Sequence, residues 1–294
     1  MKRAFVAMRT YFYRLTARGE LLHEGITVDD EQFRDIFFGN LQPNTTGLHP
    51  DYPYCSPCGA EMNFLLPEDT PYVFTRFDGE RLYFAPRRSV QFDPEQLVFD
   101  AGVLYHRAPH QQWGRLSLAV LMELAPLLSP WGDWYAIVWK GTLSVIPPRQ
   151  IPEHLHLIRP RASNMCAGCG RDNPSSLQIT ALFDAATLQA DSWLPVPVHT
   201  SGSLGIMHGG FVALVLDEIM GKVLSGMGIK APTAELTIRY QAPVRIGSWI
   251  QLHAEYLRSE RRAHHVRGEV RDGATRAVLA SGSAVFVVPR GTMQ

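Results

Sequence analysis

The stretch IMHGGFVALVLDEIMGK, residues 206–222, contains residue types that could polarise and attack a carbonyl group. His208 is followed by Gly209 and Gly210, and glycines at the start of a helix let a ligand approach free backbone N–H groups. The helix dipole adds partial positive charge there. The pattern predicts an oxyanion-type site, although a turn in which the glycines serve only close packing explains these residues equally well.

Two acids, Asp217 and Glu218, interrupt an apolar helix predicted over residues 211–220. Because this helix has no broad polar face, it should be buried nearly all round. An unpaired buried carboxylate costs several kcal/mol, so we interpret Asp217 as a group retained for chemistry. Glu218 points about 100° away and is predicted to pair with Lys222 on an exposed strip.

Asp217 and Gly209 are too far apart to serve one centre within one chain. Eight residues of helix separate them, about 12 Å at 1.5 Å per residue, whereas an acid or base must reach within about 3 Å of the reacting group. If they cooperate, the helices of two subunits must lie antiparallel. The sequence therefore predicts a two-fold homodimer with two composite sites, and a dimer of such dimers is compatible with it.

The elements around this helix alternate apolar and polar residues, as antiparallel strands do. Strands are expected at residues 177–184, 187–194, 234–244, 249–260, 262–272 and 274–289. The last two are joined through Asp272-Gly273, which favours a hairpin. One long helix against a curled antiparallel sheet buries the helix economically, so residues 164–294 are predicted to form an α+β domain.

The length of 294 residues favours two domains. Residues 1–146 are predicted to form a separate α+β domain, with a functional or heavily turned loop at residues 40–64. Residues 147–163 are rich in proline and are predicted to be a linker, with His154 and His156 in solvent. Strand-like pieces of the first domain lie at residues 9–16, 19–25, 71–77 and 81–86, and a helix is expected at residues 114–128.

Four cysteines form two C-x-x-C pairs, Cys55 with Cys58 and Cys166 with Cys169. Two such pairs commonly build a tetrahedral zinc site. More than a hundred residues separate them, far beyond the roughly 15 to 20 of a compact zinc ribbon. We therefore expect reduced cysteines in turns, with a zinc ion shared by the two halves as the alternative.

The charge balance argues against some partners. Lys plus Arg and Asp plus Glu both number 28, so the formal net charge is zero and neither nucleic acid nor a membrane is an expected partner. No apolar run of about 18 residues occurs, and no secretion-type apolar segment follows the N-terminal basic residues, which predicts a cytoplasmic protein. The motifs G-x-S-x-G, G-x-x-x-x-G-K-[ST] and H-E-x-x-H are absent, and no cofactor is expected.

Residues from about 164 to 290 resemble hotdog-fold acyl-CoA thioesterases of the phenylacetate-associated, thioesterase-superfamily type. The resemblance rests on CAGCGRDNPSSLQI, GIMHGGFVALVLDEIMG and TAELTIRYQAPVRIGSWI. Ser176 departs from the family's usual glycine in the first of these. Residues 9–145 resemble the uncharacterised protein family 0598, which carries no known activity; its pattern includes a Ser-Pro-Cys-Gly like Ser56–Gly59 here.

The C-terminal resemblance implies an acyl-CoA thioesterase and assigns roles to the residues of the motif. The N–H of Gly209, assisted by Gly210, would hold the oxyanion. Asp217 of the partner subunit would act as base or nucleophile. His208 would fix the sulfur end of the thioester or the turn itself. Thr233 would position the water or the acid, although a β-branched strand residue needs no such role.

The phosphates of coenzyme A need cationic partners. The candidates are Arg258, Arg261, Arg262 and Arg267, which a solvated strand edge explains as well. Two further functions stay open: a non-catalytic acyl-CoA binding or sensing protein, and a zinc-dependent interaction module on a hotdog dimer.

Overall fold

The computed structural model describes residues 9–203 and 205–290. The prediction that no secretion-type segment follows the N-terminal basic residues concerns in part residues 1–8, which lie outside the described residues. The chain divides into two compact units. One runs to Ser129 and resumes over Trp134–Arg149, and the other comprises Pro130–Asp133 and the chain from Gln150 onward.

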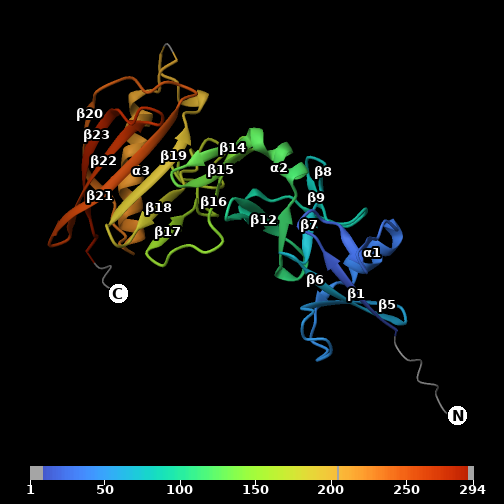
Figure 1. The fold of residues 1–294 in the computed structure, drawn as a ribbon. Helices are drawn as coiled ribbons and strands as arrows, with labels where there is room; N and C mark the ends of the chain where they lie inside the picture. Colours follow the sequence, from blue (N-terminus) through green and yellow to red (C-terminus); the bar gives the residue numbers. More distant parts are fainter. Residues whose placement is uncertain (1–8, 204, 291–294) are drawn as a thin grey trace. The chain divides into compact units, whose positions relative to one another are not determined.

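The C-terminal unit is one long helix, α3 (Gly209–Gly226), against a seven-stranded antiparallel sheet (Figure 1). The strand order is β17-β18-β19-β21-β22-β23-β20. The strands are β17 (Leu155–Ile158), β18 (Ala181–Asp184), β19 (Gln189–Pro195), β20 (Thr233–Tyr240), β21 (Trp249–Glu260), β22 (Ala263–Asp272) and β23 (Val278–Val287), and a short 3-10 helix, η4 (Val198–Thr200), precedes α3. The predicted hotdog-like arrangement of a helix on an antiparallel sheet is confirmed for this unit.

The core of this unit lies between α3 and the inner face of the sheet. Leu216, Ile219 and Val223 of α3 are fully buried, and alternate residues of the strands, such as Leu252 and Val266, meet them. Each such side chain stabilises the fold by about 1.5–3 kcal/mol relative to exposure. This packing fixes which side chains of α3 can face a substrate.

The predicted linker at residues 147–163 contains the edge strand β17, so that part of the prediction is wrong. Leu155–Ile158 pairs with Ala181–Asp184 of β18, and Ile158 packs against the core. The flanking prolines mark turns at the two ends of a short strand. His156 stacks on Phe183 with ring centroids 6.3 Å apart, so it also contacts the unit.

Residues 177–184 were predicted as one strand, but only Ala181–Asp184 is a strand. The N–H groups of Leu177 and Ile179 donate to the carbonyls of Ala167 and Gly168. The first half of the predicted strand, residues 177–180, therefore forms hydrogen bonds with the loop at Ala167 and Gly168 instead of pairing within the sheet. The helix α3 starts at Gly209, directly after His208, whose side chain caps it, and extends beyond the apolar stretch to Gly226.

The N-terminal unit contains several small sheets. They have the orders β3-β2-β1-β6-β5-β4, β10-β9-β8, β11-β12-β13-β7 and β14-β15-β16. The strands are β1 (Arg9–Leu15), β2 (Leu21–His23), β3 (Ile26–Thr27), β4 (Gln42–Pro43), β5 (Tyr54–Cys58), β6 (Glu61–Pro67), β7 (Tyr72–Phe74), β8 (Arg76–Phe77), β9 (Arg81–Tyr83), β10 (Ser89–Gln91), β11 (Leu97–Asp100), β12 (Val103–Arg107), β13 (Trp113–Leu116), β14 (Leu128–Trp131), β15 (Trp134–Trp139) and β16 (Thr142–Ile146). The helices are α1 (Glu31–Gly39) and α2 (Leu118–Leu124), with 3-10 helices η1 (Pro94–Gln96), η2 (Pro109–Gln111) and η3 (Ala125–Leu127).

Two sequence predictions in this unit need correction. The segment at residues 40–64, expected to be a functional loop or a heavily turned segment, is not one long loop but contains β4, β5 and the start of β6 between turns. The helix expected at residues 114–128 is only α2, because Gly114–Leu116 pairs with β7 and the Ser117 hydroxyl caps the helix that follows. Among the described residues, none of the helices combines the length and hydropathy that crossing a membrane requires.

Candidate functional site

The start of α3 presents one backbone donor without an acceptor among the described residues. His208 is the N-cap, and its Nδ1 accepts a hydrogen bond from the Gly210 N–H at 2.9 Å. The N–H of Phe211 donates to the His208 carbonyl. The N–H of Gly209 is left for a ligand, where the helix dipole favours negative charge.

The two glycines differ in whether their N–H groups are available to a ligand. Gly210 was predicted to assist Gly209, but its N–H is already bound to His208. His208 therefore caps the start of the helix, and its predicted role at the sulfur end of the thioester stays a prediction. Because its Nδ1 accepts, the neutral ring carries its proton on Nε2. His208 is itself held by its N–H, which donates to the Thr200 carbonyl at 2.8 Å.

Tyr240, at the end of β20, was missed by the sequence analysis. Its hydroxyl donates to the Gly209 carbonyl at 3.0 Å, and a methyl group added at Gly209 would stand 3.5 Å from the Tyr240 ring. The ring is 57% exposed. It therefore packs against Gly209 at the start of α3 and is open to solvent. Its place at the end of the T-x-x-L-x-I-x-Y pattern was the available sequence signal.

Asp217 has a hydrogen-bonding partner in its own chain. The Thr233 hydroxyl donates to Asp217 Oδ1 at 2.6 Å. A β-bulge between Thr233 and Glu235 shifts the register of β20 against β23. Strict alternation would place the side chains of Thr233 and Glu235 on the same, outer face of the sheet. The bulge instead turns the Thr233 side chain toward α3. One carboxylate oxygen is thus fixed, and the other has no hydrogen-bond partner within residues 9–203 and 205–290.

One face of α3, called here the uncovered face, is covered only in part within the chain, so the helix is wrapped less completely than predicted although none of its residues from Phe211 to Gly226 is fully exposed. Ala213, Leu214, Asp217 and Gly221 are half-buried and lie three or four residues apart. Asp217 is neither fully buried nor unpaired. The cost of burying an unpaired charge therefore does not apply to the isolated chain.

The uncovered face lies beside an open sheet edge. β20 is the last strand of the sheet and pairs on one side only, with β23 (Figure 1). Most of its side chains are exposed, including Thr233, Ala234 and Tyr240. An edge strand of eight residues with this exposure offers a row of backbone groups for pairing with another chain.

Glu218 and Lys222 form the predicted ion pair, with 3.1 Å between Nζ and Oε1. The expected exposed strip is wrong, because the two side chains are only 14% and 5% exposed. The loop at Cys166–Gly170 covers them. Cys166 Sγ lies 3.7 Å from Glu218 Oε2, and burial together with the neighbouring Glu218 raises the pKa of Cys169 to about 12.

The two cysteine pairs have different surroundings. Cys55 and Cys58 lie on the strand β5, three residues apart, so they point to opposite faces of the sheet. Cys55 is buried and burial raises its pKa, whereas Cys58 Sγ lies 3.4 Å from the Ser56 hydroxyl. These two thiols cannot hold one ion together. The expectation of a turn at this C-x-x-C is also wrong, because both cysteines lie on the strand β5.

Three of the four arginines proposed for the phosphates already have partners. Arg258 pairs with Glu260 at 2.8 Å and Arg267 pairs with Glu255. Arg262 donates to the Val288 carbonyl. Arg261, in the turn between β21 and β22, has no hydrogen bond or ion pair with another described residue.

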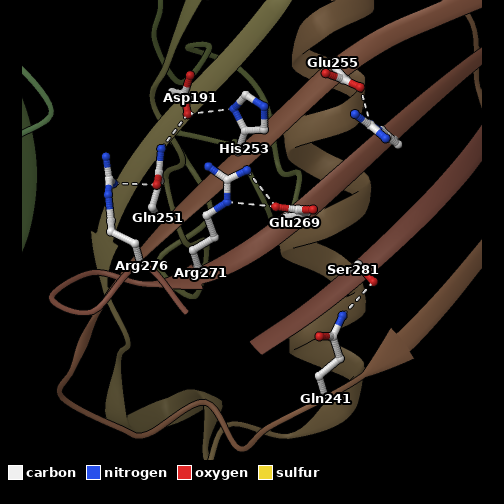
Figure 2. Close-up of polar contacts among 10 residues, drawn as sticks. Asp191, Gln241, Gln251, His253, Glu255, Glu269, Arg271, Arg276 and Ser281 are labelled. Carbon is white, nitrogen blue, oxygen red and sulfur yellow. Dashed lines mark hydrogen bonds and ion pairs between the residues drawn. The ribbon is translucent and has the colours of Figure 1, made fainter. Parts of the chain in front are cut away.

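The outer face of the sheet, away from α3, is polar and largely charge-compensated. Figure 2 shows Asp191 between His253 and Gln251, and Arg271 against Glu269. The Asp191 to His253 Nδ1 distance is 3.0 Å. Arg276 on the same face donates to the Gln251 side chain, so the polar groups drawn there are largely bound to one another.

Two family models match the chain. Residues 204–278 match the thioesterase superfamily, and residues 3–130 match a domain of unknown function (DUF4505). Both resemblances drawn from the sequence are thus confirmed at the level of the family. The C-terminal unit thus contains a segment similar to the thioesterase superfamily, and the N-terminal unit is similar to a domain without an assigned activity.

Solved structures also resemble the chain in part. A thioesterase superfamily protein is 22% identical, with 42% of this chain and 60% of that chain covered and a TM-score of 0.40. Thioesterase superfamily member 2 of zebra fish is 20% identical, with 42% and 91% covered and a TM-score of 0.38. A Streptococcus mutans protein solved with acetyl CoA is 19% identical, with 35% and 82% covered and a TM-score of 0.34. The chain thus spans about three fifths of the first of these proteins.

Proposed function

We propose that the protein hydrolyses acyl-CoA thioesters at a site shared by two subunits. One observation carries the proposal: α3 presents an unoccupied N–H at Gly209 and, on the same helix, an aspartate held by Thr233. The match of residues 204–278 to the thioesterase superfamily supports the thioester as substrate. Coenzyme A as the thiol is the expectation that the sequence resemblance adds.

The two groups supply the two kinds of help that this hydrolysis needs. The N–H of Gly209 donates to the carbonyl oxygen as it becomes an oxyanion. Asp217 takes the proton of an attacking water or attacks the carbonyl carbon itself. If water attacks, the carbon–sulfur bond then breaks and releases the carboxylic acid and the free thiol. If Asp217 attacks, loss of the thiol leaves an anhydride between Asp217 and the acyl group, and water then hydrolyses it to the carboxylic acid. Single-turnover hydrolysis in water labelled with heavy oxygen tests the second route, because heavy oxygen enters Asp217 only when water opens such an anhydride at the Asp217 carbonyl.

The two groups must come from different subunits. α3 is one continuous helix from Gly209 to Gly226, so eight residues of regular helix separate Gly209 and Asp217 by about 12 Å. The uncovered face of α3 and the open edge of β20 adjoin both groups. A two-fold dimer formed through this edge would cover Asp217 and bring it to the partner's Gly209.

The oxyanion role can be tested by removing the N–H of Gly209. Gly209 is the first helical residue, where proline is well tolerated, and His208 has the extended backbone that a residue before proline needs (φ −62°, ψ 138°). Gly209→Pro removes the N–H, so we expect kcat for acyl-CoA hydrolysis to fall roughly 100- to 1000-fold.

Gly209→Ala is the matched control. It keeps the N–H, and its methyl group meets the Tyr240 ring at an ordinary 3.5 Å, so near-normal kcat is expected. Equal activity of the two variants would refute the oxyanion role. Thermal stabilisation of the wild type by acyl-CoAs of several chain lengths, with no turnover of any, would instead identify a binding protein.

A further inference from the structure

Three potential metal ligands meet where a loop of the C-terminal unit covers the middle of α3. Cys166 Sγ, Cys169 Sγ and a carboxylate oxygen of Glu218 lie within 4.8 Å of one another. Cys166 Sγ is 3.7 Å from Glu218 Oε2. Zinc–sulfur and zinc–oxygen bonds of about 2.3 and 2.1 Å in a tetrahedral site separate the two ligand atoms by roughly 3.6 Å. In the structure the Cys166 thiol donates a hydrogen bond to Glu218 across this distance, and the same spacing fits two ligands of one ion.

The loop is shaped to close on the carboxylate. A methyl group added at Gly168 would stand 2.5 Å from Glu218 Oε2, and one added at Gly170 would stand 2.4 Å from the Asn164 carbonyl oxygen. The Gly170 N–H donates to the Cys166 carbonyl at 2.9 Å. Both glycines are needed for the chain to turn this tightly over Glu218.

The charges around the cluster suit a divalent cation. Lys222 Nζ binds Oε1 of Glu218 at 3.1 Å, which leaves Oε2 to face the sulfur atoms. Two thiolates and one carboxylate around Zn²⁺ carry one net negative charge, and the Lys222 ammonium neutralises it. Because Lys222 is only 5% exposed, this compensation takes place away from bulk water.

We propose that Cys166, Cys169 and Glu218 bind one Zn²⁺ ion, with one coordination position left for water. Thiolate ligands at tetrahedral spacing select zinc over magnesium or calcium. Binding converts both thiols to thiolates and releases their two protons to solvent. The ion would fasten the loop to α3 one residue from Asp217. The site uses only the C-terminal cysteine pair, unlike the four-cysteine alternative considered from the sequence.

The metal content of the purified full chain tests the proposal without any measurement of activity. We expect about one zinc ion per chain. After chelation, added Co²⁺ should give thiolate-to-cobalt charge-transfer absorption in the near ultraviolet. Cys166→Ser and Cys169→Ser should each weaken or abolish this band, while Cys58→Ser, in the N-terminal unit, should leave it unchanged.

Glu218 needs a separate variant, because removing it alone would strand the buried Lys222. The double variant Glu218→Gln, Lys222→Met avoids that and should bind cobalt more weakly than the wild type. A wild-type chain that holds no stoichiometric zinc and gives no cobalt band would overturn the proposal. So would a band that survives both cysteine substitutions. Circular dichroism of each variant shows whether a lost band reflects unfolding.

Discussion

Thr233 has the most specific contact of any candidate residue at the site, a 2.6 Å hydrogen bond to Asp217. Hydrogen bonds to charged groups contribute about 1.5–3 kcal/mol. Because Thr233 is exposed in the single chain, we expect the lower end, so Thr233→Val should reduce kcat roughly tenfold. Steady-state kinetics on an acyl-CoA measures this.

Thr237→Val is the control for that substitution. Thr237 lies on the same strand but lines a shallow hollow on the outer face of the sheet, with Arg239, Ser281 and Ser283. It makes no contact with Asp217, and the variant should retain wild-type kcat. If the Thr233 variant also turns over at the wild-type rate, Thr233 has no role in positioning the acid.

His106, in the N-terminal unit, gives a prediction about stability and pH. It is 1% exposed, its Nδ1 donates to the Arg107 carbonyl at 2.7 Å, and its Nε2 accepts from the Asp93 N–H at 3.0 Å. Burial lowers its pKa below 6.5, against the opposing effect of the backbone hydrogen bonds. The folded state therefore binds fewer protons than the unfolded state below that pH.

The stability contributed by neutral His106 is complete above pH 6.5 and is lost as the pH falls below it. The slope for one such group approaches about 1.4 kcal/mol per pH unit. Urea unfolding at several pH values between 7 and about 5 measures it, with His106→Gln as reference. The same pH dependence in both proteins would show that His106 does not contribute.

Among the elements, the edge strand β17 was missed by the linker prediction. Its contribution to the stability of the sheet can be tested by truncation. A fragment of residues 150–294 keeps the strand, and one of residues 160–294 lacks it. Both lack Pro130–Asp133, so their difference reports on β17. Loss of Ile158 from the core should lower the free energy of unfolding by roughly 2 kcal/mol, measured by urea unfolding. Equal stabilities would show that β17 does not support the sheet, and Ile158→Ala in the full chain is the matched control.

Local patterns predict the elements in which burial alternates regularly. Residues 249–260 were placed correctly because apolar and polar side chains alternate along β21. β17 was hidden by the prolines around it, and α1 by its short length and aromatic sequence. In the site, Gly209 and Asp217 stand out as unusual residues of an apolar helix. The cluster of Cys166, Cys169 and Glu218 does not, because it joins segments about fifty residues apart whose approach no local pattern encodes.

At the scale of the whole molecule, the candidate chemistry belongs to the C-terminal unit. Its thioesterase-superfamily match covers residues 204–278, whereas the N-terminal unit matches a family without an assigned activity. The chain alone exposes a helix face and a sheet edge beside both candidate groups. Pairing of two chains would bring the Gly209 N–H of one chain to the Asp217 carboxylate of the other.

Complementation between inactive subunits tests this central claim most directly. Gly209→Pro and Asp217→Asn chains, carrying different affinity tags, are co-expressed, and the mixed dimer is isolated through both tags. If each site joins one chain's Gly209 to the other chain's Asp217, the mixed dimer has one intact site and one doubly defective site. It should then show about half the wild-type kcat per dimer, while each parent stays nearly inactive. A mixed dimer as inactive as its parents would contradict the shared site.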